Sequence, residues 1–297
     1  MDKMFSDKKI IALFVLPAIV LFIMFIPIPL ISSLVLSFFK WDLLSPPRFI
    51  GFRNFIRMVT LDSVFLQSIG NTFRYLIYSI LLQIPLAYFL AILLTRGSLG
   101  EKGFRNLIFM PVTLSGTAVA LMFYFVYHRD TGLINNFIRL FAGKDFVFAW
   151  LAEASSAMIA VCIAVAWQFV GYHMVIFITG ITGISNDIMD AARIDGANSL
   201  QVAWHVITPL MKPVLNVSLI LITTSSLKAF DAIYVMTQGG PMHATEVMAS
   251  YMYERAFHHL DYGYGSAIGL ILFLLCVAFS LLWARIFRRR EGEEFAE

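Results

Sequence analysis

The stretch ASSAMIAVCIAVAWQFVGYHMVIFITGITGISN, residues 154–186, contains no Asp, Glu, Lys or Arg. A helix rises about 1.5 Å per residue, so about 20 apolar residues cross the hydrocarbon core of a bilayer. The stretch is long enough to do so, with residues 157–183 as the expected span. Backbone polar groups in lipid must be satisfied within their own segment, so we expect this span to be a helix.

Five further apolar stretches lie on either side of it. Four of them contain a long run without charge, and the fifth is interrupted only by Lys228 and Asp231. They place the other expected spans at residues 10–39, 75–95, 106–127, 214–237 and 264–286. The sequence therefore predicts an all-α integral membrane protein with six transmembrane helices, forming one transmembrane domain over residues 1–297.

Composition agrees with the membrane class. Hydrophobic residues make up 59% of the 297 residues and charged residues only 14%, whereas soluble chains are about a quarter charged. The net charge of +3 is too small to indicate nucleic-acid binding. Cys162 and Cys276 lie inside apolar runs, and their spacing indicates neither a disulfide framework nor a metal site.

Basic residues set the expected orientation. With six spans both termini share one side, and that side carries twelve Lys and Arg residues in short loops and tails, from Lys3 through Arg96 to Arg290. The other side carries nine, in longer loops. The higher density of Lys and Arg marks the cytoplasmic side, so we expect both termini in the cytoplasm.

The loop at residues 185–213 contains signals for two short helices. Asn186 can cap the first helix, and Asp187 and Asp190 are expected in its first turn, where the helix dipole favours anions. Gly196 can end it in the left-handed conformation, at positive φ.

Asn198 or Ser199 can cap the second helix, which Pro209 is expected to end. Its apolar residues are expected on one face: Leu200, Ala203, Trp204 and Ile207. Such a loop could bind in a groove of a cytoplasmic partner, or it could lie on the membrane surface. The residues alone leave both alternatives open.

A spaced pattern in this loop resembles a known family signature. Asp190-Ala191-Ala192, three residues, Gly196, nine residues and then Val206-Ile207-Thr208-Pro209 resembles the loop of permease subunits in binding-protein-dependent ABC importers. The family pattern has Glu, Ile and Leu where this chain has Asp190, Val206 and Thr208. The resemblance implies a type I importer permease fold with cytoplasmic coupling helices. It also implies that the residues in contact with the ATPase are Asp190, Ala191, Ala192, Asp195, Gly196 and Ala197.

Further motifs resemble the carbohydrate-uptake permeases, similar to the maltose and glycerol-phosphate types. They are residues 49–55 (FIGFRNF), Asn71-Thr72, residues 195–197 (DGA), residues 230–234 (FDAIY), residues 237–241 (TQGGP) and Thr245. The resemblance implies a prokaryotic inner-membrane location and a second, related permease as the partner in a heterodimer. It also implies two ATP-binding subunits and an external solute-binding protein.

Polar residues inside the spans are candidates for a solute path, because burying them in lipid is costly. Lys228 and Asp231 are three apart and are expected to face each other on one helix, either as a neutralised pair or as a wall of the path. Gln168 and Tyr172 beside Phe169 would suit a sugar, which has apolar faces and a polar rim. Ordinary helix packing is the alternative, and His173 is interpreted as a packing residue.

The resemblance adds residues to this site. It implies that a transmembrane sugar site, as in maltose-type permeases, would use Gln168, Phe169 and Tyr172 on the fourth span. On the fifth span it would use Ser225, Ser226 and Ala229.

The sequence contains no G-x-x-x-x-G-K-S/T phosphate loop and no hydrolase motif, so ATP and Mg²⁺ are expected only in partner subunits. The expected function is the solute path of an ATP-driven importer for an oligosaccharide, monosaccharide, polyol or glycerol phosphate. The alternatives are an ion-coupled secondary transporter, a membrane-embedded enzyme, or an importer permease for a non-sugar solute. The sequence leaves the particular solute open, and also which subunit of the pair holds it.

Overall fold

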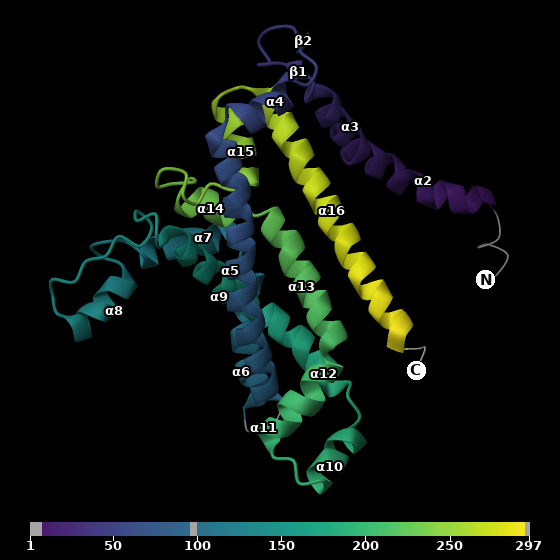
Figure 1. The fold of residues 1–297 in the computed structure, drawn as a ribbon, viewed down its shortest axis with the longest axis vertical. Coiled ribbons are helices and arrows are strands. Elements are labelled where there is room, and N and C mark those ends of the chain that lie inside the picture. Colours follow the sequence, from purple (N-terminus) through teal and green to yellow (C-terminus); the bar gives the residue numbers. More distant parts are fainter. Residues whose placement is uncertain (1–7, 96–99, 295–297) are drawn as a thin grey trace. The chain divides into compact units, whose positions relative to one another are not determined.

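The structure is a computed structural model that describes residues 8–95 and 100–294, in which the regular elements are almost entirely helical (Figure 1). Lys3 and Arg96, two of the basic residues used for the orientation, lie outside the described residues. The chain divides into two compact units, residues 1–63 with 252–274 and residues 64–251 with 275–297, and each is described by itself. The single transmembrane domain stays a prediction.

The first unit begins with an apolar segment broken once. Its elements are α2 (Lys8–Phe25), α3 (Pro27–Leu36), β1 (Phe39–Lys40), β2 (Arg48–Phe49), α4 (Arg53–Thr60), the π-helix η3 (Glu254–His258) and the start of α16 (Tyr262–Glu294). Pro27 occupies the first turn of α3, where its missing N–H costs nothing. The helix ends at Leu36 rather than at the expected residue 39, because Phe39 pairs with Phe49 in an antiparallel ribbon.

Polar side chains hold the loops of this unit together. The Asn54 amide donates to the backbone carbonyls of Ser37 and Phe39, at 2.8 and 3.1 Å. Arg57 pairs with Asp261 at 2.8 Å, and the Tyr264 hydroxyl donates to Asp62 at 2.6 Å. The FIGFRNF motif at residues 49–55 therefore includes a residue, Asn54, that fixes the end of the first span.

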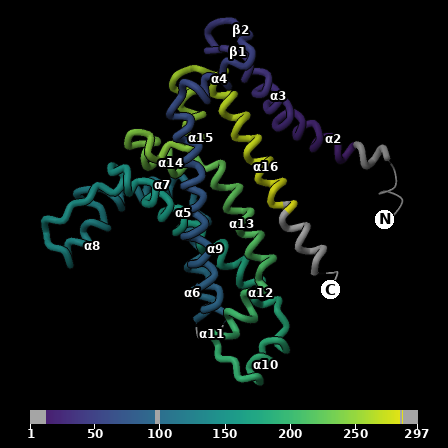
Figure 2. The backbone as a smooth tube through the Cα atoms, viewed as in Figure 1, coloured from purple at the N-terminus to yellow at the C-terminus, as the bar shows by residue number. Residues whose placement is uncertain are grey.

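The second unit holds most of the helices. They are α5 (Ser63–Leu94), α6 (Glu101–Phe109), the 3₁₀-helix η1 (Met110–Thr113), α7 (Gly116–Val126), α8 (Leu133–Ala142), α9 (Ala157–Thr182), α10 (Asn186–Ile194), α11 (Ser199–Gln201), the π-helix η2 (Val202–Ile207), α12 (Thr208–Leu210), α13 (Lys212–Leu227), α14 (Asp231–Met236) and α15 (Met248–Tyr253). Helix α9 is its centre, since 15 of its 26 residues are buried and it contacts α6, η1, α7, α13 and α14. Figure 2 shows α10 and α11 together at one end of this unit.

Two of the expected spans are bent rather than straight. The stretch at residues 106–127 turns by 99° between Glu101–Thr113 and Gly116–Val126. Pro111 lies in the turn, and Leu114 is extended with ψ 149°. Close packing on α9 accompanies this bend: a Cβ on Gly171 would lie 2.1 Å from the Ile108 carbonyl oxygen, so only glycine fits there.

The expected span at residues 214–237 is also wrong as a single helix. Helix α13 ends at Leu227 and α14 begins at Asp231, with three residues between them. A separate bend of 68° lies between Ser199–Leu210 and Lys212–Leu227. Among the described residues four helices are long and apolar enough to cross a membrane, or six if each bent pair is one span. The other helices agree with the expected spans, but α5 starts at Ser63 and α16 continues to Glu294.

Two apolar clusters form the core of the second unit. One gathers Tyr75 of α5 with residues of α7, α14 and the first half of α9. The other gathers Ala87 and Ala91 of α5 with the second half of α9, and with Val202, Ile207 and Met211 of the loop at residues 185–213, which is called the coupling loop below for its predicted role. The positions between Tyr75 and Ala87 on α5 therefore lie between the two clusters.

Candidate functional site: a polar cavity and a coupling loop

A cavity of about 520 Å³ lies inside the second unit. Its walls come from α5, from the bend between η1 and α7, from α9, and from the break between α13 and α14. All eight residues predicted for the solute path line it: Gln168, Phe169, Tyr172, Ser225, Ser226, Lys228, Ala229 and Asp231. The structure therefore brings these residues together, while their role in transport stays a prediction.

The break between α13 and α14 supplies the charged part of the wall. Lys228 follows the last residue of α13, and Asp231 is the first residue of α14. They are not on one helix face as expected, and no ion pair joins them in the described part of the chain. The helix dipole stabilises a cation near a helix C-terminus and an anion near a helix N-terminus. Each of the two charges is therefore favoured at its position without an ion pair between them.

Helix α9 supplies the aromatic part of the wall and supports the bent span. The Gln168 amide donates to the Leu114 carbonyl at 3.0 Å, which satisfies a backbone group that the bend leaves outside helical bonding. Phe169 and Tyr172 are 37% and 38% exposed, and the Tyr172 ring meets the His173 ring edge-on at 5.3 Å. Gln168 thus has a structural bond as well as a place in the cavity wall.

A third wall of the cavity lies on α5 and was not predicted from the sequence. Tyr75, Ser79 and Gln83 line the cavity, and each is at most 4% exposed. The available signal was the four-residue spacing of Ser79 and Gln83 within an apolar run, which puts both on one helix face. His173, interpreted as a packing residue, is buried as expected but also lines the cavity, and its Nδ1 has no hydrogen-bond partner among the described residues.

The coupling loop begins with a helix whose C-terminus matches the prediction in detail. Gly196 has φ +85°, as expected. The Ala197 N–H donates to the Ala192 carbonyl and the Gly196 N–H donates to the Arg193 carbonyl, both at 3.0 Å, which is a Schellman motif. The N-cap is Ser185 rather than Asn186, and Asp190 lies one turn later than expected.

The second helix of the loop is capped by Asn198, as one of the two predicted alternatives. Its side chain accepts from the N–H groups of Leu200 and Gln201, and the Gln201 side chain accepts from the Asn198 N–H, completing a capping box. Pro209 does not end this helix. Residues 202–207 form wide π-turns, and the Thr208 hydroxyl donates to the Ala203 carbonyl at 2.8 Å, so the chain continues helically to Leu210.

The expected single apolar face of this helix is divided in two. Ala203 and Ile207 are buried against the bundle, whereas Leu200 and Trp204 are 65% and 61% exposed. The buried pair ties the loop to α5 and α9, because Ile207 belongs to the same apolar cluster as Ala87 and Met174. The exposed pair leaves an apolar surface on the loop that no described residue covers.

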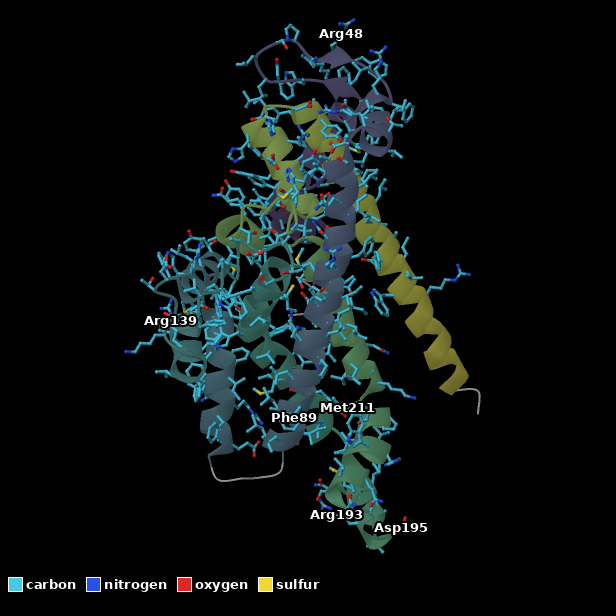
Figure 3. The ribbon with its side chains drawn as sticks, turned by 60° about the vertical axis from the view of Figure 1, so that its left-hand side comes forward. Arg48, Phe89, Arg139, Arg193, Asp195 and Met211 are labelled. Carbon is cyan, nitrogen blue, oxygen red and sulfur yellow. The ribbon has the colours of Figure 1, made fainter. Side chains whose placement is uncertain are left out.

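The acidic position of the family signature lies on the surface. Asp190 accepts a hydrogen bond from Arg193 at 2.9 Å, and both side chains are more than 60% exposed. Figure 3 shows Arg193 and Asp195 at the same end of the unit. The loop therefore presents charged and apolar side chains outward from one tip.

A multi-span helical protein with a cavity lined by apolar, polar and charged side chains, and with an exposed two-helix loop, has the architecture expected of a membrane permease. Residues 83–292 match the family described as binding-protein-dependent transport system inner membrane component, so the chain belongs to this family of multi-pass membrane transport components. It is 34% identical over 98% of its length to the probable ABC transporter permease protein YurN of Bacillus subtilis, all of which is covered. It is 30% identical to the multiple sugar-binding transport system permease protein MsmF of Streptococcus mutans, over 94% of this chain and 95% of that protein.

The fold agrees with this assignment. A chain of a bacterial alginate ABC transporter, solved in complex with an alginate pentasaccharide-bound periplasmic protein, aligns with a TM-score of 0.82 at 20% identity. The alignment covers 95% of this chain and 94% of that one. The predicted all-α, type I importer permease fold is therefore confirmed.

Proposed function

We propose that this chain forms part of the solute path of an ATP-driven importer for a saccharide or a related polyhydroxy compound. The observation that carries the proposal is the convergence of eight predicted path residues on one cavity. Aromatic faces at Phe169 and Phe230 beside the Tyr172 hydroxyl and the Gln83 and Gln168 amides provide stacking surfaces and hydrogen-bonding groups together, which is the chemistry a sugar ring needs. The sugar-transport name of MsmF supports the same class.

ATP hydrolysis belongs, in this proposal, to two separate nucleotide-binding subunits that bind ATP and Mg²⁺. They dock on the coupling loop, where Leu200 and Trp204 present apolar area and Asp190 presents charge. Motion of the ATPases reaches the cavity through α9, because the loop packs on its second half and the cavity is lined by residues near its middle. The permease itself makes and breaks no covalent bond.

A second, related permease completes the path, and an external binding protein delivers the solute. The alginate transporter in complex with its periplasmic protein supports a partner of this kind. Both termini and the coupling loop lie on the cytoplasmic side of a prokaryotic cell membrane, and the spans contact lipid.

Co-purification and uptake test the proposal. The chain is co-expressed with candidate ATPase, permease and binding-protein genes from the same genome, and the purified complex is reconstituted into proteoliposomes. We expect ATP-dependent uptake of radiolabelled saccharide that requires the binding protein. Uptake driven by an ion gradient without ATP, or a chain that purifies without any ATPase, would refute the importer assignment.

A further inference from the structure

The cavity wall on α5 contains a buried amide, that of Gln83, which stabilises no other described part of the fold through a hydrogen bond. Gln83 is 4% exposed, lines the cavity, and forms no hydrogen bond with another residue in the described part of the chain. It lies two residues from the centre of the charge-free run at residues 75–95, about 3 Å along the helix axis. A bare amide at such depth in a membrane span is costly, and packing would be served better by an apolar side chain.

Comparison with Gln168 distinguishes an amide that stabilises the fold from an amide that is available to a ligand. Both glutamines are 4% exposed and line the same cavity. The Gln168 amide donates to the Leu114 carbonyl, so the fold alone explains why an amide is buried at this position. Gln83 has no such bond, although interhelical hydrogen bonds are the ordinary use of polar side chains in membrane bundles.

Between the two apolar clusters, the buried stripe of α5 carries polar residues at the level of the cavity. Its buried residues recur every four positions: Tyr75, Ser79, Gln83, Ala87 and Ala91. Tyr75 belongs to one apolar cluster and Ala87 and Ala91 to the other, and Ser79 and Gln83 lie between them. The polar residues buried nearer the start of α5 have hydrogen-bond partners: the Asn71 amide donates to the carbonyls of His243 and Glu246. The stripe thus becomes polar where the cavity replaces packed side chains.

We propose that Gln83 is a solute-contacting, specificity-determining residue, whose amide accepts from and donates to hydroxyl groups of a saccharide in the cavity. This inference rests on the proposed function. An amide offers one carbonyl acceptor and two N–H donors without charge, so it suits a neutral diol rather than an isolated anion. Together with Tyr172 of α9 it places contacts to the solute on two different helices.

The first experiment compares Gln83→Leu with Gln168→Leu in the reconstituted complex. Leu removes the amide at similar volume. Because Gln83 has no protein partner, Gln83→Leu should leave the Tm of the purified complex unchanged or raise it, whereas Gln168→Leu should lower it by leaving the Leu114 carbonyl unsatisfied. A Tm that falls for Gln83→Leu as it does for Gln168→Leu would assign Gln83 to the fold instead.

Transport is measured with glucose, maltose, raffinose and glycerol, which are all neutral polyhydroxy compounds, using the compound that the wild-type complex takes up fastest. Gln83→Leu should lower its uptake at subsaturating concentration about 2- to 13-fold, which corresponds to one lost neutral hydrogen bond. Unchanged uptake would overturn the inference. If the wild-type complex, still bound to its ATPase, transports none of the four, the solute class is refuted and this inference with it, but the permease assignment is not.

Cysteine labelling tests the geometry independently of uptake. In a Cys162→Ala, Cys276→Ala background, Gln83→Cys should react with methanethiosulfonate ethylammonium, and the transported saccharide should slow the reaction. Ala87→Cys is the matched control: it lies one turn further along the same stripe, is 0% exposed, and should not react. Labelling of position 83 that no transported saccharide slows would show a cavity-facing residue that does not touch the solute.

Discussion

Replacing Gly196 is the sharpest test of the coupling loop. Its φ of +85° lies in the left-handed region, where a side chain costs roughly 1–2 kcal/mol. A Cβ built there meets no atom within 4 Å, so within this chain that strain is the whole cost. Since native proteins are stable by about 5–15 kcal/mol, the subunit should survive the change and still insert into the membrane.

The order of three variants distinguishes strain from a clash with the ATPase. Alanine has the full strain of the left-handed conformation but the smallest side chain. Asn and Asp tolerate that conformation better, but their side chains extend further from the backbone. If the loop docks into an ATPase groove, ATPase retention and uptake should decrease from wild type to Gly196→Ala and be lost in Gly196→Asp, with Gly196→Asn close to Asp. If backbone strain alone mattered, Gly196→Ala would be the worst of the three.

The assays are membrane fractionation, affinity pull-down of the ATPase, and saccharide uptake. Gly183→Ala is the matched control, because Gly183 precedes the same loop with φ −79° and a Cβ there would meet its nearest atom at an ordinary 3.4 Å. We expect it to behave like wild type. Normal uptake by the Gly196→Asp protein would show that this loop is not the coupling element.

Three further outcomes are expected. A cysteine replacing the exposed Ser199 should resist an impermeant thiol reagent in intact cells and react in opened ones; labelling from outside would reverse the proposed orientation. Asp190→Lys should weaken ATPase retention on pull-down, with Asp190→Glu tolerated and the Tm unaffected, because the exposed pair with Arg193 contributes less than about 1 kcal/mol; a large Tm loss would contradict this. Tyr172→Phe should reduce uptake several-fold while basal ATPase activity stays normal, and equal uptake would remove Tyr172 from the solute path.

Local patterns in the sequence were sufficient for the features that depend on nearby residues. Hydropathy locates the spans because the cost of burying charge in lipid is a property of each segment by itself. The glycine turn at Gly196 and the cap at Asn198 follow from hydrogen bonds within five residues, so their conformations could be predicted without the rest of the chain. The positions matched to the family's solute path were likewise found from sequence, and the structure brings them into one cavity.

Only the tertiary structure decided where those helices break and which polar residues are left without a partner. At the bend before α7, the Leu114 carbonyl accepts a hydrogen bond from the Gln168 amide of α9, 54 residues away. No local sequence signal could therefore show that the bend is tolerated. Pro209 lies inside a helical stretch because residues 202–207 form π-turns and the Thr208 hydroxyl donates a hydrogen bond to the Ala203 carbonyl. Gln83 and Gln168 look alike in sequence, as glutamines in apolar runs. Both line the cavity, but only Gln168 has a hydrogen-bond partner, the Leu114 carbonyl, and that difference exists only once the helices are packed.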